Sequence, residues 1–259
     1  MFRSHLIIFI LLNICLQICL AQTGASLTIN REDRTIRVVQ TAPSSEGAKF
    51  VPSNPTCEEG FRIGTVFAPA PYQVETFVNN TKILSNIALL RNPEGEDNAE
   101  KLDLYSGDLD FDSERLCPGE VQADGEQVTI FEGRTTITGK EFHYDNATGL
   151  GSLQGPVDLQ REAEGESPAL EARSSNMTFN VDEDITILEG GVELSSDGRV
   201  SRAESVRFDE DNGLAILIGD PATSRKDNDV VEGQIIEYDL DNNDVVVKGN
   251  IKANFSFER

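Results

Sequence analysis

The second half of the chain repeats one pattern of apolar and polar positions four times. Each copy reads apolar, polar, aromatic, then a cluster of Asp, Asn and Gly, then an apolar run that closes on a glycine. Period-two alternation on both sides of a turn-forming cluster predicts a β-hairpin. The predicted hairpins span residues 142–155, 177–190, 206–219 and 236–249.

Alternation also assigns the side chains of each hairpin to two faces. The aromatic residues of the first strand share a face with the apolar residue two positions before each closing glycine. We therefore expect one buried inner face and one solvent face. The predicted inner-facing residues are Phe142, Tyr144, Leu153, Phe179, Leu188, Phe208, Leu217, Tyr238 and Val247, and the predicted outward-facing residues are His143, Thr178, Arg207 and Glu237.

The closing glycines carry a further prediction. They are expected to point inward and to mark a bend, a bulge or a close approach of backbone. The same alternation assigns the residue two positions after each glycine to the inner face. The glycines are Gly155, Gly190, Gly219 and Gly249, and the residues that follow at this spacing are Val157, Val192, Pro221 and Ile251.

The first half of the chain is less regular. Residues 27–39 predict a hairpin, and residues 102–111 resemble a weaker copy of the repeated unit. The segment 41–60 is rich in Pro, Ser and Gly, so we expect a loop or an irregular edge crossing. Apolar residues at helical spacing predict a short helix near 82–91 that Pro93 ends.

The first 21 residues predict a secretory signal peptide. Arg3 precedes a long apolar run, and Cys19 and Ala21 place small residues before a cleavage site. An uncleaved N-terminal anchor is the alternative. The expected organisation is a signal peptide (1–21), an irregular N-terminal part (22–124) and a regular repeat region (125–259).

Removal of the signal peptide leaves two cysteines, Cys57 and Cys117. An even pair in an exported chain predicts one disulfide. The alternative is two buried free thiols.

Composition excludes several classes of function. The chain has 45 acidic and 22 basic side chains and a formal net charge of −23, which opposes binding to nucleic acid. His5 and His143 are the only histidines. The chain therefore has too few histidines for a multi-histidine metal centre, and we do not expect a Ser/His/Asp catalytic triad. We expect no enzyme, no catalytic residue, no metal and no cofactor.

Two acidic clusters begin like a calcium-binding loop. They lack the glycine and the glutamate that complete an EF-hand loop, and turn chemistry explains them better. Paired carboxylates elsewhere are expected to be solvated charges. The two clusters are Asp108, Asp110 and Asp112, and Asp239, Asp241 and Asn243.

The repeated unit resembles the OstA-like family of periplasmic lipopolysaccharide transport proteins, typified by LptA. The family's unit has an aromatic-Asp strand, a short turn, a Leu-x-Gly strand and a second glycine, and the best copies here are 203–219 and 233–249. The resemblance covers about residues 125–255. It implies an all-β, elongated, partly open β-jelly roll of about 14–18 antiparallel strands. Its two sheets would form a V-shaped trough built from repeated hairpins.

The same resemblance implies a function without covalent chemistry. The trough would shield the acyl chains of lipopolysaccharide or a similar envelope glycolipid in the periplasm, and the protein would bridge the inner and outer membranes. Exposed edge strands would pair with jelly-roll partners at both membranes or with a second copy, end to end. The alternative is a closed β structural or interaction module of the cell envelope with no lipid cargo. A carbohydrate-active enzyme is disfavoured because the chain has no tryptophan.

Overall fold

The structure is a computed structural model that describes residues 24–254, except for 32–33, 97–98, 113, 124–126, 166, 181–182, 184, 210–211 and 243. The predicted signal peptide lies outside the described residues. The described chain is almost entirely antiparallel β-structure, with one short 3-10 helix at Ser44–Glu46. The all-β prediction is therefore confirmed, with more strands than the 14–18 expected.

The strands follow one another from β1 to β21. Those of the irregular part are β1 (Ser26–Arg31), β2 (Arg34–Gln40), β3 (Lys49–Glu58), β4 (Phe61–Phe67), β5 (Val74–Val78), β6 (Thr81–Ser85), β7 (Ile87–Pro93), β8 (Lys101–Tyr105), β9 (Asp108–Phe111) and β10 (Pro118–Gln122). Those of the repeat region are β11 (Val128–Glu132), β12 (Thr135–Gly139), β13 (Glu141–Asp145), β14 (Leu150–Arg161), β15 (Leu170–Asn180), β16 (Ile185–Ser196), β17 (Arg199–Asp209), β18 (Leu214–Lys226), β19 (Asp229–Asp239), β20 (Val245–Lys248) and β21 (Lys252–Asn254).

Two walls of strands enclose the interior. In the first wall β3, β4, β7, β8 and β13 pair in that order. In the second wall the order is β1, β2, β5, β6, β11 and β12. Strand β14 joins them, because its first half pairs with β13 and its second half with β12. The two walls are thus parts of one continuous 19-stranded sheet.

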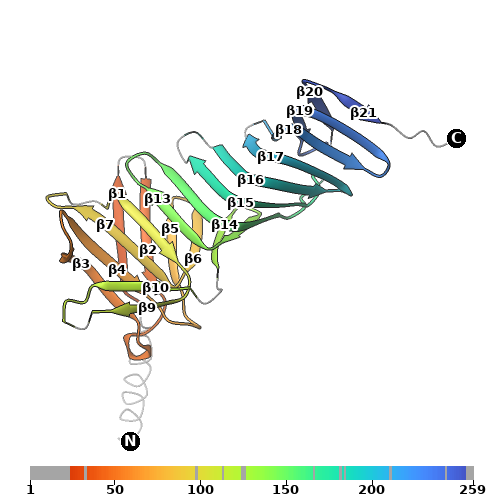
Figure 1. Cartoon of the computed structure of the whole chain (residues 1–259). Coiled ribbons are helices and arrows are strands. Elements are labelled where there is room, and N and C mark those ends of the chain that lie inside the picture. Colours follow the sequence, from red (N-terminus) through yellow and green to blue (C-terminus); the bar gives the residue numbers. More distant parts are fainter. Residues whose placement is uncertain are drawn as a thin grey trace, which may run out of the picture.

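From β14 to β19 every strand is long enough to run through both walls. Consecutive strands pair as hairpins, and the pairing register shifts at mid-strand, for example between Gln154 and Val157 and between Glu189 and Val192. Such a shift inserts residues and bends the strand. The walls therefore join along a line of bends. The hairpin turns form two rows on the opposite side, one at the free edge of each wall, and we call the opening between these rows the mouth. Figure 1 shows these strands stacked into an elongated body, with β20 and β21 at its far end.

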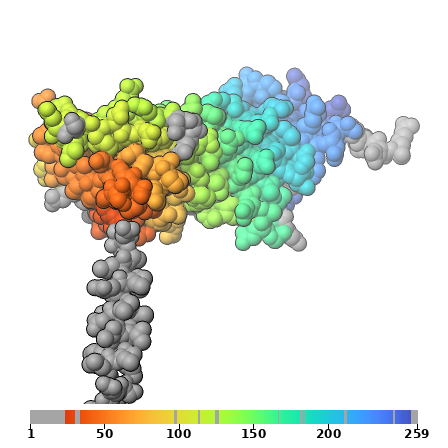
Figure 2. Space-filling view, turned by 90° about the horizontal axis from the view of Figure 1, so that it is seen from below, coloured from red at the N-terminus to blue at the C-terminus, as the bar shows by residue number. Residues whose placement is uncertain are grey.

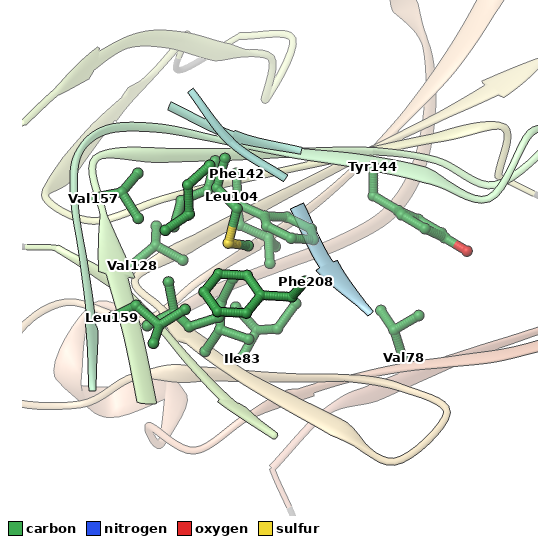
Figure 3. Close-up of a cluster of buried hydrophobic side chains, with 14 of the residues drawn as sticks. Val78, Ile83, Leu104, Val128, Phe142, Tyr144, Val157, Leu159 and Phe208 are labelled. Atoms are coloured by element: carbon green, nitrogen blue, oxygen red, sulfur yellow. The ribbon is translucent and has the colours of Figure 1, made fainter. Parts of the chain in front are cut away.

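A single apolar core fills the space between the walls. Figure 3 shows Ile83 and Leu159 from the second wall beside Phe208 from the first, and Val78 of the second wall below Tyr144 of the first. A smaller cluster lies on the outer face of the first wall, under the β9–β10 hairpin, and consists of Phe67, Ile87, Leu89 and Leu109.

This hairpin explains why the helix predicted near 82–91 is wrong. The segment forms β6 and β7 instead. Strand β7 is buried on both faces, because Ala88 and Leu90 contact the main core while Ile87 and Leu89 contact the hairpin's cluster. A doubly buried strand loses its alternation, so its apolar residues imitate helical spacing.

The interpretation of residues 102–111 as a weaker copy of the repeated unit is also wrong. Strand β8 pairs with β7 and β13, whereas β9 pairs with β10. The chain leaves the first wall at Gly107, whose φ of +128° suits glycine and whose N–H donates to Asn86. The hairpin predicted over 27–39 does form from β1 and β2. The segment 41–60 contains the irregular edge strand β3, whose pairing with β4 shifts register twice.

The disulfide between Cys57 and Cys117 is confirmed. It joins β3, at the edge of the first wall, to the residue that precedes β10. The β9–β10 hairpin is thereby fastened to the wall whose outer face it covers. Figure 2 shows this end of the molecule continuous with the repeat region in one long body.

Candidate functional site

The residues predicted to face inward lie on the inner face of the first wall. Seven of them are at most 5% exposed, and Phe179 and Val247 are partly buried. Among the residues predicted to face outward, Arg207 is exposed and Thr178 is partly exposed. The fully buried set is Phe142, Tyr144, Leu153, Leu188, Phe208, Leu217 and Tyr238.

Two extrapolations beyond the closing glycines are wrong. Pro221 is exposed because the bulge between Ile218 and Ala222 gives the inner position to Ala222 instead. Ile251 is 59% exposed because it lies in the break between β20 and β21. A bulge resets the period of two, so alternation cannot be carried through it.

The glycines themselves mark the bends, but they do not all face inward. Gly155 and Gly219 are at least partly buried at the register shifts. Gly190 and Gly249 are exposed and have φ values of +84° and +69°. Their role is to supply a backbone conformation that other residues rarely adopt.

The Asp-rich clusters serve the turns. The Asp239 carboxylate accepts the backbone N–H groups of Asp241 and Asn242, both at 2.9 Å. These hydrogen bonds lower the pKa of Asp239. Asp112 is held in the same way by the N–H groups of Glu114 and Arg115. In each acidic cluster one carboxylate, that of Asp112 or Asp239, is thus engaged by its own turn, while Asp110 accepts a hydrogen bond from Gln122 and Asp241 one from Ser167.

The mouth between the two rows of turns contains a groove that reaches the core. We call it the lateral groove. Its narrow end, about 50 Å³, lies between the β5–β6 turn and the aromatic side chains of Phe142 and Phe179. Its wider end, about 310 Å³, lies between Leu159 and Leu170 of the second wall and Phe208 of the first. The two ends share Glu132, Ile137 and Thr186.

An aromatic cluster shapes the narrow end. The Phe179 ring stacks on Phe142 and Tyr144, with centroid separations of 5.7 and 6.4 Å. Gly151 lies directly beneath this ring, since a Cβ at that position would come within 2.0 Å of it. A side-chain-free position on the neighbouring strand therefore makes room for Phe179 beside the groove.

A second opening, which we call the terminal groove, lies at the C-terminal end. It measures about 400 Å³ and its apolar lining comes from Val231, Val245, Val247, Ile251 and Ala253. Within the described residues, β20 and β21 pair only with β19, so this end of the sheet is an edge. The apolar interior is therefore reachable from the end as well as from the side.

The predicted inner residues thus divide into two sets. Phe142, Phe179 and Phe208 line the lateral groove, and Val247 lines the terminal groove. The others pack in the closed core and line neither groove: Tyr144, Leu153, Leu188, Leu217 and Tyr238. The sequence did not predict that Ile83, Ile137 and Leu159 of the second wall line the lateral groove. Alternation tells which face of a strand a residue occupies, but it does not tell which strand lies opposite that face.

Two polar contacts between described residues tie the rows of turns together. The Arg34 guanidinium, in the second wall, donates to the carbonyl oxygen of Asn146 across the mouth at 2.7 Å. The hydroxyl of Ser167, in the β14–β15 connection, donates to the carboxylate of Asp241 at 2.6 Å. The lateral groove opens between these two ties.

His143 lies on the outer face of the first wall, away from the grooves. Its Nδ1 is 2.7 Å from a carboxylate oxygen of Asp103, which also pairs with Arg91. Tyr105 packs edge-on against its ring. This network holds adjacent strands β7, β8 and β13 together.

Comparison with known proteins finds likeness in structure but not in sequence. No family model matches the sequence, and no curated protein matches it. Among solved structures the fold is similar to LptH of Pseudomonas aeruginosa, described as the LptA-homologous periplasmic component of the lipopolysaccharide transport device. The TM-score is 0.41 with 13% sequence identity, over 47% of this chain and 94% of that chain.

Proposed function

We propose that this protein is a periplasmic lipid-binding transport protein that shields acyl chains of lipopolysaccharide or a similar envelope glycolipid between the inner and outer membranes. The proposal rests on one observation: the grooves at the mouth and at the C-terminal end lead from solvent to the apolar inner face. Inner aromatic residues line the lateral groove.

The energetics favour an acyl chain as the occupant. Each methylene that leaves water for an apolar groove contributes about 0.8 kcal/mol. The wide end of the lateral groove, at about 310 Å³, is at the small end of the range of ligand pockets. Further chains require the walls to separate along the mouth, where the ties that cross it are polar contacts between turns.

The compartment and the bridging role have separate support. A disulfide is favoured in an oxidising compartment such as the periplasm. The repeated hairpin unit resembles the OstA-like family, and the β20–β21 end offers an edge to which a jelly-roll partner or a second copy can add strands.

One observation favours the alternative, a closed structural module of the envelope. Five of the predicted inner residues are packed in a filled core, with Leu188 and Leu217 0% exposed. In that case the grooves are surface features and no lipid enters.

Site-specific photo-crosslinking in cells separates the two functions. A photoreactive residue at Phe179 or Phe208 is expected to capture lipid, because both positions line the lateral groove. Thr178 and Arg207 are matched controls, since each is the preceding residue on the same strand and points outward. Equal, poor capture at all four positions in folded, exported protein contradicts lipid binding and favours the closed module.

A further inference from the structure

The rim of the second wall carries a row of positive charges. In the pairing register, Arg161 lies opposite Leu170, Leu170 opposite Ser196, Ser196 opposite Arg199, and Arg199 opposite Lys226. Arg161, Arg199 and Lys226 therefore end three strands of the same wall at the same level. We call this row, together with Arg134 in the adjacent β11–β12 turn, the basic lip.

The opposite rim is acidic. The turns of the first wall carry Asp145, Glu183, Asp209 and Asp239. The basic lip also has carboxylates beside it: Asp197 pairs with Lys226 at 2.7 Å, and Glu162 and Glu164 lie beside Arg134. An anion is therefore attracted locally, at an arginine that pairs with no described carboxylate, and not by the rim as a whole.

Arg161 is the least neutralised member beside the lateral groove. Side chains alternate between the two faces of β14, and Val157 and Leu159 are buried on the inner face. Arg161 is the next residue in this alternation, so its side chain also lies on the inner face. It lines the wide end of the groove and forms no ion pair or side-chain hydrogen bond with any described residue. An inward-phase arginine without a carboxylate partner is available to bind an anion.

Arg134 stands beside it at the same opening. Its guanidinium donates to the carbonyl oxygen of Glu162 at 3.1 Å, and its Nε lies 3.7 Å from the carboxylate of Glu164. That carboxylate is 79% exposed, so solvent screens the pair strongly. Glu132 also lines the groove, and its carboxylate accepts a hydrogen bond from Thr81 at 3.2 Å.

We propose that Arg161, with Arg134, binds the anionic head group of a single-chain amphiphile whose acyl chain lies against Leu159 and Phe208. This inference rests on the proposed lipid-binding function and adds a second class of lipid, one with a single acyl chain, to the glycolipid proposed above. The groove of about 310 Å³ suits one chain, and a guanidinium binds carboxylate and phosphate alike through paired N–H donors. The chemistry shared by a fatty acid and a lysophospholipid, one chain with one anion, fits the site.

Calorimetric titration of the mature protein with twelve-carbon ligands below their micelle concentrations tests the proposal. The ligands are laurate, lauroyl lysophosphatidylglycerol and neutral monolaurin. We expect the anionic ligands to bind at least about tenfold more tightly than monolaurin, and this preference to fall as salt is raised. A stronger preference for laurate or for the lysophospholipid identifies carboxylate or phosphate as the natural head group.

Variants of Arg161 test whether the basic lip causes the preference for anionic ligands. Arg161→Gln is expected to remove most of the anionic preference without changing monolaurin binding, and Arg161→Lys to restore part of it. Arg207→Gln, on the exposed outer face, is the matched control and leaves all affinities unchanged. Because Arg161 has no partner among the described residues, its replacement is not expected to affect folding.

Two results overturn the proposal in different ways. If all three ligands bind equally and Arg161→Gln changes nothing, lipid binding stands but the head-group site is wrong. If none of them binds to the folded protein, and the crosslinking experiment also finds no lipid, the proposed function fails together with this inference.

Discussion

The two halves of this molecule build the same pair of walls in different ways. In the irregular part, and where it meets β11 to β13 of the repeat region, the walls are assembled from short strands. Some of these pairs join strands that are distant in sequence, such as β8 with β13 and β6 with β11. In the repeat region each strand from β14 to β19 crosses both walls and pairs with its neighbours in the chain. One half closes by long-range pairing, whereas the other grows by adding hairpins.

This difference has consequences for stability. A stack of hairpins is held mainly by nearest-neighbour contacts, so it is expected to open from its free end. The irregular part must form many long-range pairs together, which makes it cooperative and slower to fold. The disulfide lies in this part, where it closes a long loop.

The largest expected effect comes from removing that disulfide. Replacing Cys57 and Cys117 with serine opens a loop with a sequence separation of 60. The loop-entropy model gives a loss of about 4 kcal/mol. We expect the loss of stability to be largest in the irregular part, where amide exchange in β3, β9 and β10 should become faster. Denaturant unfolding and hydrogen exchange measure both quantities, and a loss below about 1 kcal/mol contradicts the assignment.

The second prediction compares one buried leucine from each half. Leu104 in β8 and Leu217 in β18 are both 0% exposed, and truncation to alanine costs about 3 kcal/mol at such sites. Leu104→Ala is expected to lower protection throughout the chain. Leu217→Ala is expected to expose mainly β17 to β21 to exchange. Identical exchange patterns for the two variants would show that the halves unfold as one unit.

The third prediction concerns the boundary between the halves, at the aromatic cluster. A Cβ in Gly151→Ala would meet the Phe179 ring at 2.0 Å, so the ring must move away from Tyr144 and Phe142. Overpacking of this kind costs about 2 kcal/mol. Gly133→Ala is a control for general loss of glycine, because no atom lies within 4 Å of its added Cβ, although its φ of +55° adds some strain. Denaturant unfolding is the measurement, and equal losses in both variants would contradict the packing argument.

The halves also differ in how far the sequence predicts them. The four hairpins, their turns and the buried set from Phe142 to Tyr238 follow from alternation, because each strand of the repeat pairs with its chain neighbour. The alternation argument fails at Pro221 and Ile251, where a bulge or a break resets the phase. In the irregular part it fails at β7, because the β9–β10 hairpin buries the strand's second face.

The candidate site was less predictable than the fold. Phe142, Phe179 and Phe208 could be assigned to the inner face, but the groove they line depends on which second-wall residues lie opposite. Arg161 illustrates the remaining difficulty. Its phase on β14 follows from Val157 and Leu159, yet only the register of the whole wall brings it level with Arg199 and Lys226.

The smallest expected effect involves one tyrosine from each half, Tyr238 and Tyr105. Burial is the main cause that raises the pKa of both phenols, and a hydrogen bond with Ser196 partly offsets it at Tyr238. A raised pKa in the folded state means that the neutral phenol is stabilised by folding. Its contribution is complete below the unfolded pKa of about 10 and is lost as the pH rises through the folded value.

Tyrosine-to-phenylalanine variants test this contribution in each half. Tyr238→Phe removes the hydrogen bond that links β19 to β16, and we expect a loss of about 1 kcal/mol at pH 7. The variant should then lose less stability than the parent between pH 9 and 11, because the titrating phenol is gone. Tyr105→Phe should likewise make the free energy of unfolding less dependent on pH over this range. Urea unfolding across this range, with phenolate absorbance to follow titration, decides the matter. If Tyr238→Phe retains the parent's alkaline slope, the pKa of the Tyr238 phenol is not raised by folding.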